Sequence, residues 1–252
     1  MEYIEVSPDA LKTPSHLRCL LLGASEAGKS TLIGSMIRNK DSIFPKPGYA
    51  KFIFCSPNVG DESRRSYEDQ QYQESLRSWA HPSDIMFLDH IISYEDLMEQ
   101  CESTQGQICL IIDDVSREIF SEDITYDLFT RLSHHKGVGT IVSVHTGAGS
   151  KHPGRWYSLI FNNANYFILF RNIANRASIG MTSKAIFPNG KKFLARCLNV
   201  ATDLCGVHSY IVVDASLKNP LNNRYGVRTN IFNENNLPTL FFKNPKVYYG
   251  VH

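Results

Sequence analysis

The sequence lacks an excess of charge of either sign, and it lacks a long apolar run. Its 252 residues include 26 Lys and Arg against 25 Asp and Glu, a net charge of +1. A balanced chain has no global attraction for nucleic acid, so any DNA contact must come from a local basic patch. No segment reaches the roughly 18 uncharged apolar residues that a membrane span needs. We therefore expect no membrane among its partners.

The sequence also lacks paired cysteines and a secretory leader. The first fifteen residues carry Glu2, Glu5 and Asp9 and have no apolar core, which is not the pattern of a signal peptide. None of the six cysteines forms a C-x-x-C pair, and several lie in apolar runs that resemble buried strands. These features predict reduced cysteines in an intracellular protein.

Short apolar runs alternate with segments of helical periodicity. Continuous apolar runs of about four to eight residues are typical of strands buried on both faces of a parallel sheet. The alternation predicts an α/β fold with a central, mostly parallel sheet and helices on both faces. The predicted strands are 18–22, 51–55, 108–113, 140–145, 166–170 and 209–213, and the predicted helices are 29–38, 69–80, 93–100, 122–133 and 176–186.

The length suits one large α/β domain, or one domain with a small appendage. No internal repeat stands out, and the linker-like stretches 218–224 (KNPLNNR) and 233–238 (NENNLP) both lie near the end of the chain. We expect residues 1–232 to form the main domain and residues 233–252 a C-terminal tail.

The first predicted strand runs directly into the pattern Gly23-x4-Gly28-Lys29-Ser30, and a helical pattern follows. Strand, glycine-rich loop and helix are the context that a phosphate-binding P-loop (the Walker A motif) requires, whereas a chance glycine turn needs none of it. Glycines let backbone N–H groups surround a phosphate, and the helix N-terminus adds a positive dipole end. We expect Lys29 to contact the β- and γ-phosphates of ATP and Ser30 to bind Mg²⁺. The predicted nucleotide-binding residues are Gly23, Ala24, Ser25, Glu26, Ala27, Gly28, Lys29, Ser30 and Thr31.

The predicted strand 108–113 is followed by a second acid, so that Asp113 and Asp114 are adjacent. An apolar strand that ends in acids is the Walker B pattern of P-loop ATPases. We expect Asp113 to hold the magnesium ion through its water shell and Asp114 to polarise the attacking water. The simpler alternative is that these acids cap a helix starting near Val115.

Two histidine positions invite a functional interpretation. His145 ends the strand 140–145, where it could sense the γ-phosphate by a hydrogen bond, or it could be an ordinary loop histidine. His134 and His135 resemble a metal-binding or base pair, but adjacent residues on a helix do not face the same way. We expect these two to end a helix and to interact favourably with its dipole.

Hydrolysis in an oligomer usually needs an arginine directed at the γ-phosphate of the neighbouring subunit. Among the possible residues we select Arg131 as the catalytic arginine. Each of them could instead be a surface or ion-paired arginine. The candidates are Arg117, Arg131, Arg171 and Arg176.

Several runs beyond the Walker motifs resemble one family. They are 110–115 (LIIDDV), 128–135 (LFTRLSHH) and 140–146 (TIVSVHT), with further similarity at 52–57, 170–172 and 228–232. Together they resemble the genome-packaging ATPases of the FtsK–HerA superfamily, in the version found in Polinton/Maverick-type viruses and virus-like elements; poxvirus-type packaging ATPases are more distant. The resemblance spans roughly residues 17–232 and implies a P-loop NTPase fold of the additional-strand type. His145 stands where the family usually has glutamine, and Arg176 comes two places after the family's arginine position.

The resemblance implies an ATP-hydrolysing motor that translocates double-stranded DNA into a preformed capsid. It implies a homo-oligomeric ring of five or six subunits, a capsid or portal-type vertex protein as partner, and a location inside the host cell, in the nucleus rather than the cytoplasm, or in the virion. The basic, glycine-rich loop 147–155 would face DNA, or it is a solvated loop. The aromatic tail would dock on a neighbour or on capsid protein, or pack back on the sheet. The candidate DNA-facing cations are Lys151, His152, Arg155, Lys184, Lys191 and Lys192.

Three other functions stay open. The first is a P-loop helicase or DNA-processing ATPase without a capsid, which should not depend on procapsids. The second is a small-molecule kinase, which should not turn over ATP without an acceptor. The third is a nucleotide-gated scaffold, which should bind ATP tightly without hydrolysing it.

Overall fold

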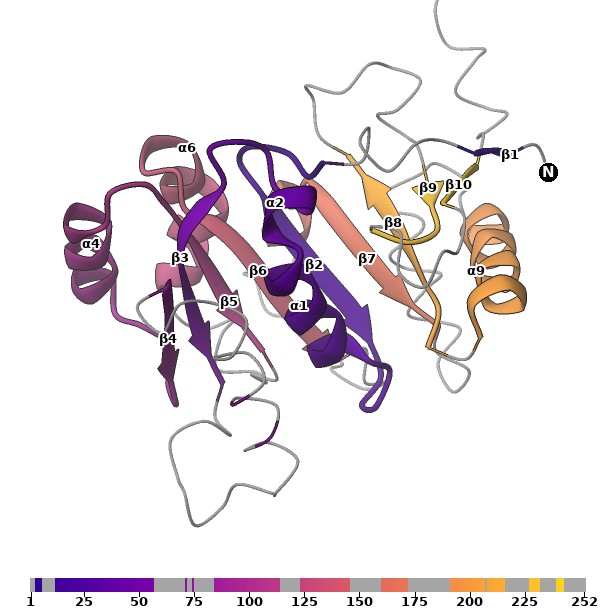
Figure 1. Cartoon of the computed structure of the whole chain (residues 1–252), viewed down its shortest axis with the longest axis horizontal. Helices are drawn as coiled ribbons and strands as arrows, with labels where there is room; N and C mark the ends of the chain where they lie inside the picture. Colours follow the sequence, from indigo (N-terminus) through magenta and orange to yellow (C-terminus); the bar gives the residue numbers. More distant parts are fainter. Residues whose placement is uncertain are drawn as a thin grey trace, which may run out of the picture.

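In the part of the chain that the structure describes, the strands form one ten-stranded sheet in the order β1-β10-β9-β8-β7-β2-β6-β5-β3-β4 (Figure 1). The computed structural model describes residues 3–5, 12–56, 71, 74, 84–113, 123–145, 160–171, 191–206, 208–215, 227–231 and 239–242. The strands are β1 (Tyr3–Glu5), β2 (Arg18–Gly23), β3 (Tyr49–Cys55), β4 (Ile85–Leu88), β5 (Gln107–Ile112), β6 (Gly139–His145), β7 (Tyr166–Phe170), β8 (Tyr210–Asp214), β9 (Val227–Arg228) and β10 (Leu240–Phe242). The helices are α1 (Lys29–Arg38), α2 (Lys40–Ile43), α4 (Tyr94–Ser103), α5 (Asp123–Asp127), the π-helix η4 (Leu128–Leu132), α6 (Ser133–His135) and α9 (Lys191–Cys205).

Six neighbouring strands of the sheet run parallel to one another, namely β7, β2, β6, β5, β3 and β4. The remaining strands, β8, β9, β10 and β1, extend the sheet in antiparallel fashion beyond β7. The predicted α/β fold with a mostly parallel sheet is therefore confirmed. β6 lies between β2 and β5, so one additional strand separates the strand that precedes the glycine loop from the strand that precedes Asp113.

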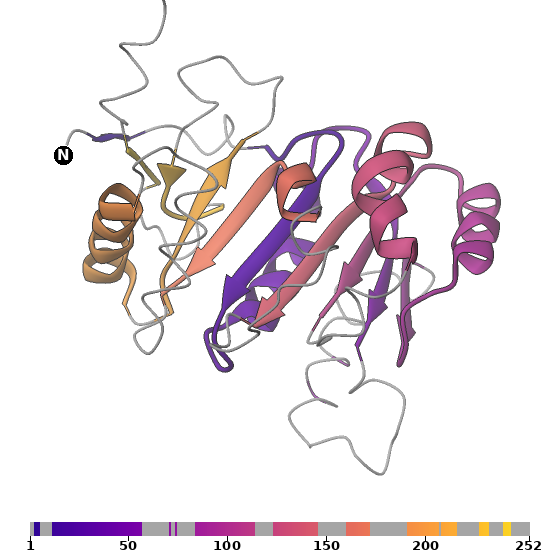
Figure 2. The same cartoon turned by 180° about the vertical axis from the view of Figure 1, so that it is seen from behind.

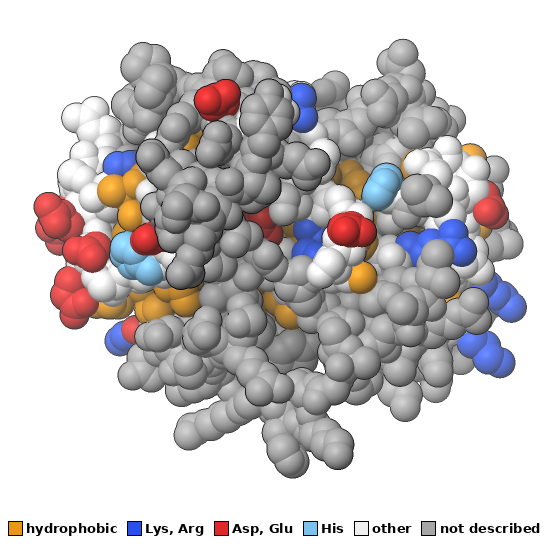
Figure 3. All heavy atoms as spheres, turned by 90° about the horizontal axis from the view of Figure 1, so that it is seen from below, with side chains coloured by type: hydrophobic (Ala, Val, Ile, Leu, Met, Phe, Trp, Pro, Cys, Tyr) orange, Lys and Arg blue, Asp and Glu red, His pale blue; other side chains and the backbone are white. Residues whose placement is uncertain are grey.

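The parallel strands all end at the same edge of the sheet. This carboxyl edge is the lower edge in Figure 1, and it faces the viewer in Figure 3. Gly23 and His145 are paired neighbours there, because β2 and β6 are in parallel register up to their last residues. Loops at the carboxyl edge of an open α/β sheet are where such folds bind ligands.

Alternate residues of β2 supply two separate cores, because successive side chains of a strand point to opposite faces. Cys19 and Leu21 pack in the core under α1 and α2, which cover the front of the sheet in Figure 1. Leu20 and Leu22 pack in the core on the opposite face, which Figure 2 presents. Every one of these side chains is almost fully buried, which explains why residues 19–22 are all apolar.

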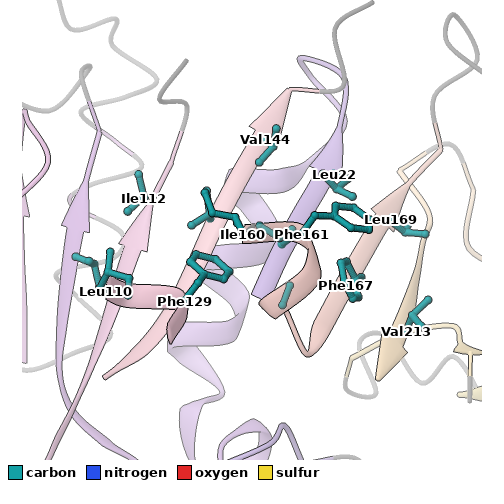
Figure 4. Packing of buried hydrophobic residues seen from close by; sticks show 14 of the residues in the cluster. Leu22, Leu110, Ile112, Phe129, Val144, Ile160, Phe161, Phe167, Leu169 and Val213 are labelled. Carbon is teal, nitrogen blue, oxygen red and sulfur yellow. The ribbon is translucent and has the colours of Figure 1, made fainter. Parts of the chain in front are cut away.

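The second core joins elements that are far apart in sequence. Figure 4 shows Phe129 of η4 near Leu110, and Phe161, from the short helical segment 160–163, near Leu22 and Phe167 of the sheet. The same core takes in the buried side of α9, so helices cover both faces, as predicted. Bulky side chains of this kind each stabilise the fold by about 1.5–3 kcal/mol when fully buried.

Most predicted elements occur close to their expected bounds. α1 and β7 match the prediction to the residue, and Ser93 caps α4 by accepting a hydrogen bond from the Asp96 N–H at 3.1 Å. The single helix predicted at 122–133 is wrong in detail, because the segment forms α5, a π-helical turn and α6 in succession. Of the predicted helix 69–80 only residues 71 and 74 are described, both helical, and the predicted helix 176–186 lies outside the described residues.

Part of the predicted tail belongs to the sheet. β10 pairs with both β9 and β1, and Phe242 is 1% exposed within the second core. Of the interpretations offered for the aromatic tail, packing on the sheet is what Leu240–Phe242 do; Tyr248 and Tyr249 lie outside the described residues.

All six cysteines are free thiols, in agreement with the prediction that none is paired. In the part of the chain that the structure describes, no helix has both the length and the apolar character to cross a membrane.

Candidate nucleotide-binding site

The glycine loop leaves the end of β2 and returns as the first turn of α1. Gly28 is the N-cap of α1 and has φ = 94°, a left-handed conformation that glycine adopts without strain. Gly23 is limited by space instead, because a Cβ at this position would lie 2.9 Å from the Cβ of Phe170. Both outer glycines of the motif are therefore required by the fold of the loop.

The side chain of Lys29 folds back onto the glycine loop. Its side chain is 6% exposed, and its Nζ donates hydrogen bonds to the carbonyl oxygens of Gly23 at 3.2 Å and Ala24 at 2.7 Å. A buried ammonium group needs such acceptors, because an unpaired charge in the interior is costly. The positive charge thus sits next to the N-terminus of α1, so both favour an anion at the same place.

Ser30 and Asp113 meet although they are 83 residues apart in sequence. Ser30 Oγ donates a hydrogen bond to Asp113 Oδ2 at 2.7 Å. Asp113 directly follows β5, is 4% exposed, and its backbone N–H donates to the carbonyl oxygen of Cys55 at 2.9 Å. A serine hydroxyl and a carboxylate are oxygen ligands of the kind that Mg²⁺ prefers, so this pair fits the predicted metal-binding residues.

A pocket of about 510 Å³ opens at these residues. It contains Ser25, Glu26, Gly28, Lys29, Ser30 and Thr31 of the predicted set together with Asp113. The pocket also has an aromatic part that the sequence interpretation missed, namely Phe170, His208 and Tyr210. These residues follow the loop by roughly 140 positions or more. Phe170 lies in the run 170–172 that resembles the packaging ATPases, but no motif links any of the three residues to the loop.

Of the other two predicted catalytic residues at this edge, one is not described and one is described only by its backbone. Asp114 lies outside the described residues, so its role stays a prediction. The backbone of His145 is described as the last residue of β6, beside Gly23, while its side chain is not. Strand pairing therefore positions residue 145 next to the start of the glycine loop.

Arg131 does not line the pocket of its own chain. Its guanidinium makes two hydrogen bonds to the carboxylate of Asp127, at 2.9 Å and 2.7 Å, one helical turn away. Its neighbours Phe129 and Leu132 belong to the core on the sheet face opposite α1. Arg171 is half-buried at the end of β7, and Arg117 and Arg176 lie outside the described residues.

His134 and His135 end α6, as predicted for a favourable interaction with the helix dipole. His134 also lies 3.1 Å from a guanidinium nitrogen of Arg18, measured from its Nε2, at the amino edge of the sheet. No cluster of three or more potential metal-binding side chains occurs among the described residues.

The predicted DNA-facing cations are mostly outside the described ranges. Lys192 is exposed on α9, and Lys191 is described only by its backbone. On the face that Figure 3 shows, acidic side chains gather at the α4 end, and Lys and Arg side chains lie mostly toward the α9 end. The exposed acids of α4 are Glu95, Asp96, Glu99 and Glu102.

Comparisons with known proteins add a distant structural likeness. A scan against protein-family models gives no match, and a search of curated proteins gives no match either. One solved structure that matches is that of Thermomonospora curvata EccC (ATPases 2 and 3) in complex with a signal sequence peptide, with a TM-score of 0.37 and 16% sequence identity. The match covers 60% of this chain and 29% of that chain, so this chain spans less than a third of its length. The assignment of the fold rests on the strand order and the loop geometry described above.

Proposed function

We propose that this protein binds ATP with Mg²⁺ at the loop 23–30 and hydrolyses it. The observation that supports this best is the 2.7 Å hydrogen bond between Ser30 and Asp113. It joins the residue after the loop lysine to the acid that follows a strand two positions away in the sheet. A glycine turn formed by chance would have no reason to face such an acid across an intervening strand.

In this proposal different groups of the chain hold different parts of the nucleotide. Lys29 and the first turn of α1 hold the phosphates, and Ser30 and Asp113 hold Mg²⁺, which when bound neutralises charge on the phosphates. Asp114 follows Asp113 directly and orients the attacking water by accepting its proton. His145 donates a hydrogen bond to the γ-phosphate from the end of β6.

We further propose that hydrolysis drives double-stranded DNA into a capsid. The support is the resemblance of runs 110–115, 128–135 and 140–146 to packaging ATPases of the FtsK–HerA superfamily. The working unit is then a ring of five or six copies in the host cell, docked on a capsid or portal-type vertex protein. Arg131 serves as the arginine that reaches the site of the neighbouring subunit. To do so, its guanidinium must release the Asp127 carboxylate and bind the γ-phosphate.

The decisive measurement is ATP hydrolysis with and without double-stranded DNA for the wild type, Lys29→Ala and Asp114→Asn. We expect DNA to stimulate the wild type and each substitution to lower the rate at least about 100-fold. Lys40→Ala, which alters a half-exposed lysine paired with Asp84, is the control and should behave as the wild type. Equal rates in all four proteins would exclude the ATPase.

The capsid-specific part of the proposal has its own test. Adding procapsids to the DNA-stimulated reaction should make DNA resistant to nuclease in the wild type but not in Asp114→Asn. DNA-stimulated hydrolysis that neither uses nor needs procapsids would instead favour a helicase or another DNA-processing ATPase.

A further inference from the structure

The aromatic part of the pocket has no task in the proposed binding of phosphates and Mg²⁺. Phe170 and Tyr210 are 3% and 8% exposed, and their rings pack against each other with centroids 5.3 Å apart. His208 differs from them because its side chain is exposed while it lines the pocket. A ligand in the pocket can therefore reach the imidazole ring of His208 without displacing core residues.

The backbone around His208 is firmly held. Ser209 donates its N–H to the carbonyl of Gly206 at 3.2 Å and accepts a hydrogen bond from the N–H of Arg171 at 3.3 Å. The Ser209 hydroxyl also lies 2.9 Å from that of Thr202 on α9. The turn between α9 and β8 is thus anchored to β7 and to α9, which fixes the point from which His208 projects.

His208 is adjacent to the phosphate loop. A Cβ built on Gly28 would lie 3.8 Å from both Cβ and Nδ1 of His208, and at the same distance from Cε1 of Phe170. These are ordinary van der Waals distances, so the imidazole ring stands directly beside the N-cap of α1. A nucleotide held by the first turn of α1 must pass close to this ring.

The order of strands decides which part of a nucleotide lies there. Asp113 follows β5, two strands from β2 on one side, and His208 precedes β8, two strands from β2 on the other side. The metal must lie toward Asp113, because Ser30 and Asp113 would hold it, and the terminal phosphates lie beside the metal. The opposite end of the nucleotide, the nucleoside, then extends toward β8.

We propose that His208 contacts the nucleoside of the bound nucleotide, by packing its ring against the base. This inference rests on the proposed function, because it requires the triphosphate to be held at Lys29 and Ser30. Aromatic side chains that stack on bases contribute a substantial and sequence-tolerant share of binding energy. His208 therefore makes the site prefer a nucleoside triphosphate to inorganic triphosphate.

The test compares the equilibrium binding of ATP and of inorganic tripolyphosphate by calorimetry, in the presence of Mg²⁺. His208→Ala should weaken ATP binding about 5- to 100-fold and leave tripolyphosphate binding unchanged. His208→Phe, which keeps an aromatic ring, should retain most of the ATP affinity. His90→Ala removes an exposed histidine beyond β4, far across the sheet order from β8, and should change neither ligand.

Each outcome separates the two proposals. If Lys29→Ala abolishes ATP binding but His208→Ala binds ATP like the wild type, the inference about His208 is wrong and the ATP site stands. If His208→Ala weakens both ligands equally, His208 contacts phosphate and the inference is again wrong. If Lys29→Ala binds ATP like the wild type, the nucleotide site itself is wrong, and the inference falls with it.

Discussion

The two ends of β2 both carry polar side chains, but they use them differently. At the amino end, the Asn165 side chain accepts a hydrogen bond from the Arg18 N–H at 2.9 Å and donates one to the His16 carbonyl at 2.7 Å. His16 Nδ1 in turn donates to the carbonyl of Ser133 at 2.8 Å. These side chains are committed to backbone groups, so they join the segments that enter the sheet.

At the carboxyl end the polar groups surround a pocket. Lys29 and Ser30 also make hydrogen bonds, but their partners are the loop's own carbonyls and the Asp113 carboxylate. A phosphate and a metal ion can take over these contacts, whereas the hydrogen bonds of Asn165 join two segments of the chain to each other. Buried polar groups therefore indicate a binding site only where a ligand can take over their partners.

The largest expected effect is a loss of ATP hydrolysis when a residue at the carboxyl end of β2 is changed. Ser30→Ala removes the hydroxyl proposed to bind Mg²⁺, and we expect hydrolysis of ATP to fall at least about 100-fold. The unfolding free energy should fall by about 1–3 kcal/mol, because the buried Asp113 carboxylate loses a hydrogen-bond donor. The measurement is the steady-state rate with urea denaturation alongside, and Ser42→Ala in the exposed part of α2 is the control. A rate equal to that of the control would contradict the magnesium role.

The opposite result is expected at the amino end. Asn165→Ala leaves the Arg18 N–H and the His16 carbonyl without their partner in a buried setting, which should lower the unfolding free energy by about 2–3 kcal/mol. ATP affinity per folded molecule should stay unchanged. Urea denaturation and calorimetry check both statements. Asn162→Ala alters an exposed asparagine of the same segment, and if it destabilises equally, the Asn165 links are not structural.

The stability at alkaline pH tests whether water reaches the buried residue Cys55. Burial raises the pKa of the Cys55 thiol to about 12, above the value of about 8.5 expected for an unfolded chain. The unfolded chain therefore loses this proton first, so the stabilisation is complete below about pH 8.5 and is lost as pH rises toward 12. In Cys55→Ala the fall of unfolding free energy between those values should be shallower by up to about 1.4 kcal/mol per pH unit. An unchanged slope would mean that water reaches Cys55.

The smallest effect concerns strain within the loop. Glu26 has φ = 61°, the one positive value at a non-glycine residue among those the structure describes, and it lines the pocket. Glu26→Gly should raise the unfolding free energy by about 0.5–1 kcal/mol, because glycine adopts this conformation freely. It should also strengthen ATP binding by removing a carboxylate near the phosphates. Glu26→Ala separates the two effects, because it removes the charge and keeps the strain; equal stability of both variants would contradict the strain.

The prediction missed one helix that has a readable sequence pattern and several short strands that have none. α9 buries Leu194, Cys197, Leu198 and Ala201, which follow the spacing i, i+3, i+4 and i+7 of an amphipathic helix. β4, β9 and β10 are only two to four residues long and lie toward the sheet edges. Such short strands carry too few residues for a periodic signal, so only pairing with neighbours reveals them.

The local sequence pattern alone was enough to predict those elements that depend on residues close together in the sequence. The strand, glycine loop and α1 follow from spacing within 18–38, and the apolar run before Asp113 follows from burial on both faces of a sheet. The tertiary structure decided what depends on strand order: that β6 lies between β2 and β5, that Asp113 meets Ser30, and that His208 stands beside Gly28. The physical reason is that hydrophobic periodicity specifies which face of an element is buried, whereas only the packing of whole elements selects the neighbour it is buried against.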